Sequence, residues 1–144
     1  MKPELIAPCG INCNICVAHL GYTMSGKRRK HQCLGCRIPG DSSKSLSRKS
    51  CAFLKKHCEL LAKNQVRFCS DCEEYPCKHL RKLDDGYVRN YNTSLIENLN
   101  FIKKEGIMSF LRDQAKKYAC PQCGGTICVH TNRCYSCHPP TESV

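Results

Sequence analysis

The sequence predicts a small, mainly α-helical fold with irregular cysteine-rich loops, and three observations support this prediction. The chain has 144 residues, 15 of them cysteines, with no tryptophan and only four phenylalanines. An apolar core of that composition is thin for a domain of this length. Apolar side chains recur at helical spacing after residue 50 and again after residue 94. We expect bound metal to supplement the core, because the binding free energy of a structural metal is also folding free energy.

The pairing of the cysteines favours metal ligands over disulfides. Ten of them form five C-x-x-C pairs, at 13/16, 33/36, 69/72, 120/123 and 134/137, a spacing typical of thiolate metal sites. The N-terminal residues contain two prolines and no apolar signal region, and no apolar run is long enough to span a membrane. We therefore expect a cytoplasmic protein with reduced thiols and no membrane partner.

Residues 1–83 are predicted to form a cysteine-rich metal-binding domain. It opens with a C-x3-C-x2-C cluster, followed by a C-x-x-C pair in which Gly35 lets the backbone turn tightly toward a metal. The candidate metal ligands of this domain are Cys9, Cys13, Cys16, Cys33, Cys36, Cys51, Cys58, Cys69, Cys72 and Cys77.

A helix is expected from about Ser50, and it raises a question about Cys51 and Cys58. In a regular helix their Cα atoms would lie roughly 10 Å apart along the axis, too far to share one tetrahedral ion. Either the helix begins after Cys51, or the two cysteines belong to different sites, or one is a buried thiol. A second helix is expected to have Pro76 in its first turn and to end at Asp84-Asp85-Gly86.

Residues 84–118 are predicted to form a helical hairpin or a kinked helix. The segment Ser94–Glu97 matches a capping box, and Gly106 separates two apolar stripes. A helix–turn–helix DNA reader is the less favoured alternative, because one glycine is short for its turn.

Residues 119–138 are predicted to form a zinc ribbon, and residues 139–144 a tail. In such a ribbon a β-hairpin brings two C-x-x-C pairs together, so that four thiolates close the coordination shell. Cys128 and His130 are interpreted as residues of a strand over 126–130 and not as ligands. The candidate ligands here are Cys120, Cys123, Cys134 and Cys137.

Two arrangements of the earlier cysteines remain open. Sequence-local pairing joins the first C-x-x-C pair to the second, and the third pair to Cys77 or Cys58. The crossed arrangement joins the first cluster to the third and groups the second pair with Cys51 and Cys58. We slightly prefer the crossed arrangement, because a metal that links distant segments closes a longer loop and so adds more stability to a thin core. Either arrangement, with the ribbon, gives three zinc ions.

The order of these clusters resembles a family of small prokaryotic proteins, domain of unknown function 3795. The resemblance rests on C-G-I-x-C-x-x-C at the start, then C-x-G-C, a cysteine-bearing helix and F-C-x-x-C-E-E-Y-P-C, and it extends through Ser94–Leu99 to the C-terminal ribbon. Tyr118 departs from it, where a tryptophan is expected, as does Lys63–Val66, where a Lys-Gly turn is expected. The resemblance implies metal binding, with zinc as the expected ion, and implies no activity.

The leading functional hypothesis is a zinc-stabilised module that binds a protein or a nucleic acid. The formal net charge is +11; each four-thiolate zinc site carries −2, so three sites would bring it to about +5. The basic run at residues 27–31 is interpreted as a solvated loop, with a phosphate contact as the alternative. No nucleophile elbow, phosphate-binding loop or zinc-protease motif is present.

Two enzyme hypotheses are the alternatives. The C-x3-C-x2-C cluster also suits an iron–sulfur redox or radical-type enzyme, although 144 residues are few for the barrel that radical enzymes use. A three-thiolate zinc site with bound water would be a Lewis acid, with Glu73, Glu74 or His79 as base. If a site lacks a fourth cysteine, His19 or His79 is the expected substitute ligand.

Overall fold

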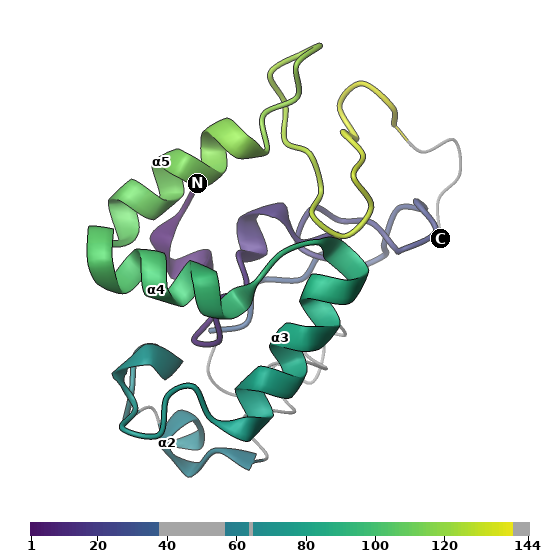
Figure 1. Ribbon diagram of the computed structural model, residues 1–144. Coiled ribbons are helices and arrows are strands. Elements are labelled where there is room, and N and C mark those ends of the chain that lie inside the picture. Colours follow the sequence, from purple (N-terminus) through teal and green to yellow (C-terminus); the bar gives the residue numbers. More distant parts are fainter. Residues whose placement is uncertain (38–56, 64, 140–144) are drawn as a thin grey trace.

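The computed structural model describes residues 1–37, 57–63 and 65–139 of the chain. Most of the helix expected from Ser50, including Cys51, and the end of the tail lie outside these residues. The helices are short turns in the cysteine-rich part and longer helices after it (Figure 1). They are η1 (Pro3–Leu5), η2 (Cys13–Ile15), α2 (Glu59–Ala62), η3 (Cys69–Asp71), α3 (Lys78–Tyr91), α4 (Leu95–Glu105) and α5 (Ile107–Lys117).

Helix α3 is longer than the sequence suggested, so the prediction that it ends at Asp84-Asp85-Gly86 is wrong. The helix runs through Gly86 and ends at Asn92, which adopts the left-handed conformation with φ of 51°. Leu80, Leu83 and Tyr87 lie on its buried side, and their spacing continues one apolar stripe across the glycine. The predicted domain boundary after residue 83 therefore lies inside a helix.

The Ser94 cap of the predicted capping box and the break at Gly106 are both found in the structure. The Ser94 hydroxyl accepts a hydrogen bond from the Glu97 amide at 3.1 Å and caps α4. Gly106 has a φ of 86° and stands between α4 and α5, which pack on each other. Phe101 and Phe110 meet edge to face across this turn, with ring centroids 5.7 Å apart. The predicted helical hairpin is consistent with this arrangement.

The main core lies between the N-terminal segment and helices α3, α4 and α5. Ile6 and Cys9 are completely buried there, as are Leu80 and Leu99. Figure 1 shows the N-terminal segment (purple) running beside the green α4–α5 pair. The N-terminal part thus obtains its core from helices that lie far away in the sequence.

No sheet is present among the described residues, which form isolated antiparallel bridges instead. Two of these bridges, Ala119 with Thr126 and Ile127 with Cys134, fall in residues 119–138, hereafter the four-cysteine segment. The predicted C-terminal β-hairpin is therefore not confirmed, although the pairing is antiparallel where it occurs. No helix in the described ranges combines the length and the apolar character needed to cross a membrane.

Candidate metal centre

The four-cysteine segment follows α5 directly and folds into two tight turns. In the first turn, the Gly124 amide donates to the Cys120 carbonyl at 2.9 Å, and the Cys120 amide donates to the Gly125 carbonyl at 2.7 Å. Gly124 adopts a φ of 73°, a backbone conformation that side chains with a Cβ rarely adopt. In the second turn, the His138 amide donates to the Cys134 carbonyl at 3.0 Å. Each turn presents both cysteines of a C-x-x-C pair on its inner side.

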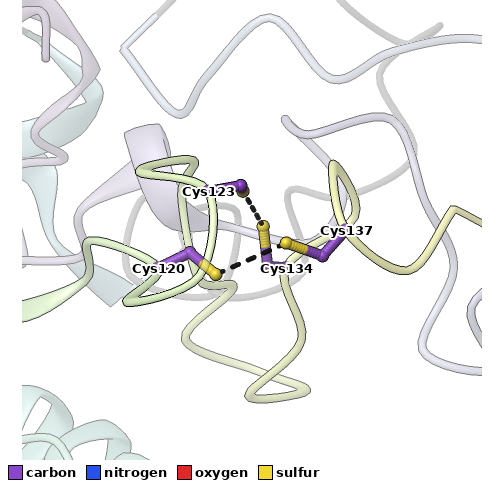
Figure 2. Close-up of side chains that lie close together, drawn as sticks. All are labelled: Cys120, Cys123, Cys134 and Cys137. Carbon is purple, nitrogen blue, oxygen red and sulfur yellow. Dashed lines mark hydrogen bonds between the residues drawn. The ribbon is translucent and has the colours of Figure 1, made fainter.

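The four sulfur atoms of this segment converge on one point (Figure 2). The Sγ atoms of Cys120 and Cys137 are 3.6 Å apart, and those of Cys123 and Cys134 are also 3.6 Å apart. All four lie within 4.8 Å of one another. A tetrahedral ion with thiolates at about 2.3 Å places neighbouring sulfurs about 3.8 Å apart. The sulfurs are thus spaced to surround a single metal ion.

Backbone amides of the two turns favour anionic sulfur at this site. Amide hydrogen bonds, first from Cys137, lower the pKa of the Cys134 thiol to about 7. The pKa of Cys120 is also lowered, first by the amide of Cys123 and then by that of Gln122. The Gly125 amide donates to Cys123 Sγ at 3.3 Å. The donors to Cys120 and Cys134 stabilise the thiolate, which is the form that binds metal.

Cys137 shows the opposite shift, and its cause is the crowding of the sulfurs. Its pKa is raised, first by its interaction with the side chain of Cys123 and then by burial. Four sulfurs this close together cannot all be anionic unless a cation lies between them. A divalent ion would supply that charge and displace the remaining protons.

The four-cysteine segment is anchored to the N-terminal cysteine cluster. The Val129 amide donates to the Ile15 carbonyl at 3.0 Å, and the Val17 amide donates to His130 Nδ1 at 3.2 Å. Cys128 is completely buried beside Val17. Cys128 and His130 therefore contact neighbouring segments, but the strand expected over 126–130 is not formed, because only isolated bridges occur there.

The first and second C-x-x-C pairs lie near each other but do not form a comparable cluster. Burial, with smaller contributions from the charges of Cys13 and Cys33, raises the pKa of Cys16 to about 11. The Gly35 amide donates to Cys33 Sγ at 3.4 Å, and His19 Nδ1 is 2.7 Å from the Cys33 carbonyl oxygen. In the described part of the chain, only the four-cysteine segment has three or more ligand atoms within 4.8 Å. Metal binding at the first two pairs stays a prediction.

Cys9 and Cys36 are buried with the apolar residues of the main core. Cys58, Cys69, Cys72 and Cys77 instead surround a hollow at the start of α3. This grouping matches the sequence-local arrangement of the third cluster and not the crossed arrangement, which had placed Cys58 with the second pair. Cys51 lies outside the described residues.

Sequence reasoning missed the aromatic contact that joins the two ends of the chain. Tyr22 and Tyr135 stack with ring centroids 3.8 Å apart, with Arg28 and Arg133 over their respective rings. The basic run at residues 27–31 contains no aromatic residue of its own. The sequence holds no signal for this pairing, since the two tyrosines are 113 positions apart.

Comparison with known proteins gives one family and no characterised relative. No curated protein matches the chain, and no solved structure matches it. The model of a family described as a protein of unknown function (DUF3795) matches residues 5–82. The matched region covers the first three cysteine clusters and ends before the four-cysteine segment. Because the match spans more than half of the 144 residues, the chain belongs to the DUF3795 family.

Proposed function

We propose that the four-cysteine segment binds one structural zinc ion and that the chain is a nucleic-acid-binding module. The observation that carries the metal assignment is the convergence of four sulfurs within 4.8 Å. A closed shell of four thiolates is characteristic of structural zinc, because a catalytic zinc keeps a position open for water. The spacing suits a single ion; a multi-iron cluster would hold the thiolates farther apart.

The nucleic-acid assignment is supported by the charge of the surface around the segment. Residues 5–37 and 114–139 contain no aspartate or glutamate. The exposed cations there include Arg28 and Arg133, whose guanidinium groups lie 5.9 and 5.4 Å from the ring centroids of Tyr22 and Tyr135. Cationic side chains without competing carboxylates bind phosphates. The stacked aromatic pair holds the loop that carries Arg28 against the segment that carries Arg133.

Fluorescence anisotropy with labelled single-stranded RNA and DNA at two salt concentrations tests this assignment. We expect binding that weakens as salt rises, because phosphate binding releases counterions. Arg28→Gln/Arg133→Gln should weaken binding and reduce the slope of log K against log salt by about 2. The matched control, Lys103→Gln/Lys104→Gln on the exposed side of α4, removes the same charge elsewhere. Equal losses in both variants, or no binding at low salt, would leave a protein partner as the alternative.

A further inference from the structure

A second group of thiols lies at the N-terminal end of α3, where two hollows adjoin. The outer hollow has a volume of about 530 Å³, and the inner one has a volume of about 30 Å³. Both are bordered by the same four cysteines: Cys58, Cys69, Cys72 and Cys77. The four thiols therefore stand at the boundary between the two spaces.

The backbone holds these cysteines in defined positions. Cys58 immediately precedes α2, and Cys77 is the N-cap residue of the 14-residue helix α3. Cys69 and Cys72 bracket the turn η3, in which the Cys72 amide donates to the Cys69 carbonyl at 3.1 Å. The Cys69 amide donates to the Pro8 carbonyl at 2.8 Å, which fixes the turn to the N-terminal segment.

The two sides of this group differ in polarity. The inner hollow is lined by apolar side chains such as Leu61, Val66 and Leu80. The outer hollow has a mixed lining, which adds polar side chains such as His57 and His79, whose rings stack with centroids 4.7 Å apart. An apolar wall behind a set of thiolates shields metal–sulfur bonds from water.

We propose that Cys58, Cys69, Cys72 and Cys77 form a second metal centre that binds zinc, with its outer side open to the hollow that His57 and His79 line. Four thiolates select a thiophilic ion, and zinc is the usual choice in a tetrahedral sulfur site. This centre is independent of the one in the four-cysteine segment, because the two share no ligand.

The second centre should bind its ion more weakly than the first. Among the described residues, the sulfurs of the four-cysteine segment alone lie within 4.8 Å of one another. No three of the thiols around the hollow lie within that distance of one another, so their side chains would have to rearrange to contact one ion. That rearrangement costs binding free energy, which a preorganised site does not lose. A competing chelator should therefore remove zinc from the second centre first.

Metal analysis and native mass spectrometry of the anaerobically purified full chain test the proposal. We expect Cys69→Ser/Cys72→Ser and Cys123→Ser/Cys134→Ser each to lose one zinc relative to wild type. The four changes together should lose two. Cys128→Ala, which removes a buried thiol outside both centres, should lose none. A folded Cys69→Ser/Cys72→Ser protein with wild-type zinc content would overturn the proposal. An iron-containing brown wild-type protein whose colour disappears in that variant would overturn the assignment to zinc.

Cys77→His provides the test if the double variant does not fold. Histidine is itself a zinc ligand, so this change should retain the metal and alter only its surroundings. In protein produced with cobalt, we expect the thiolate-to-cobalt charge-transfer band to lose the intensity of one thiolate. An unchanged spectrum would show that Cys77 is not a ligand and would overturn the four-cysteine assignment.

Discussion

The ring of Tyr22 stacks on the ring of Tyr135, with centroids 3.8 Å apart and planes inclined by 11°. This contact joins the loop after the first cysteine cluster to the C-terminal four-cysteine segment. Hydrogen bonds from the Val17 and Val129 amides act between the same two segments. The four-cysteine segment is thus packed against residues 5–82, the region that the family model matches, and is not a detached appendage.

Replacing Tyr135 should measure how strongly this contact stabilises the fold. Tyr135→Ala should lower the free energy of unfolding by about 3 kcal/mol, because it removes a buried ring and leaves a cavity. Tyr135→Phe keeps the stack and loses the hydrogen bond between the hydroxyl and Thr131, so it should cost about 1 kcal/mol. Urea unfolding followed by circular dichroism gives both values. Equal costs would mean that the hydroxyl, and not the stacked ring, carries the stabilisation.

Gly10 should tolerate alanine much less well than Gly21 does. Both glycines have a positive φ, 93° and 94°, so alanine costs about 1–2 kcal/mol of backbone strain at either position. At Gly10 a Cβ would also lie 2.5 Å from the Leu95 carbonyl oxygen, whereas nothing lies within 4 Å at Gly21. We expect Gly10→Ala to be less stable than Gly21→Ala by about 1–3 kcal/mol. Similar melting temperatures would contradict the close packing of the N-terminal segment on α4.

Asp84 should be a major contributor to the stability of α4. Its Oδ1 atom accepts hydrogen bonds from the Ser94 hydroxyl at 2.9 Å and from the Leu95 and Ile96 amides at 2.6 and 3.1 Å. Asp84→Ala should cost about 2–3 kcal/mol, because it leaves buried amides without an acceptor. Asp84→Asn, which retains an oxygen but not the charge, should cost less. A loss below about 0.5 kcal/mol for Asp84→Ala would argue against this role.

His130 should make stability depend on pH below neutrality. Burial lowers its pKa from 6.5, and Nδ1 accepts from the Val17 amide. The groups that face it from α3 are the phenol rings of Tyr87 and Tyr91. A lowered folded-state pKa means that the stabilisation is present above pH 6.5 and is lost as pH falls toward the folded pKa.

The matched variant for this effect is His130→Gln, which cannot be protonated. The difference in unfolding free energy between wild type and this variant should be larger at pH 7.5 than at pH 5.5. Comparing the two proteins cancels the acid loss of metal that both share. A difference that is constant with pH would show that protonation of His130 is not linked to unfolding.

Local patterns predicted the helical and cysteine-turn features well. The Ser94 cap of α4 and the break at Gly106 depend on nearby residues, and so does the grouping of the last two C-x-x-C pairs, which only ten residues separate. The end of α3 was mispredicted because Asp84 and Gly86 are weak helix formers. Asp84 is stabilised within α3 by hydrogen-bond donors at the start of α4. Helix propensity does not account for such a tertiary contact.

Contacts between distant segments could not be predicted from spacing. The choice between local and crossed pairing of the earlier cysteines depends on how the chain folds back, because each C-x-x-C turn has the same local geometry. The turns η2 and η3 illustrate this: each closes with an amide-to-carbonyl bond between its two cysteines, at 3.2 and 3.1 Å. Only the tertiary structure places Cys58 and Cys77 beside the second of these turns.

The most direct test of the central claim is the zinc content of the folded full chain with and without two thiols of the four-cysteine segment. We predict that Cys123→Ser/Cys134→Ser binds one zinc fewer than wild type, measured by metal analysis and native mass spectrometry. Its α-helical circular dichroism should persist, because α3, α4 and α5 pack on the main core. A folded double variant with the zinc content of wild type, or a wild-type protein without zinc, would contradict the account.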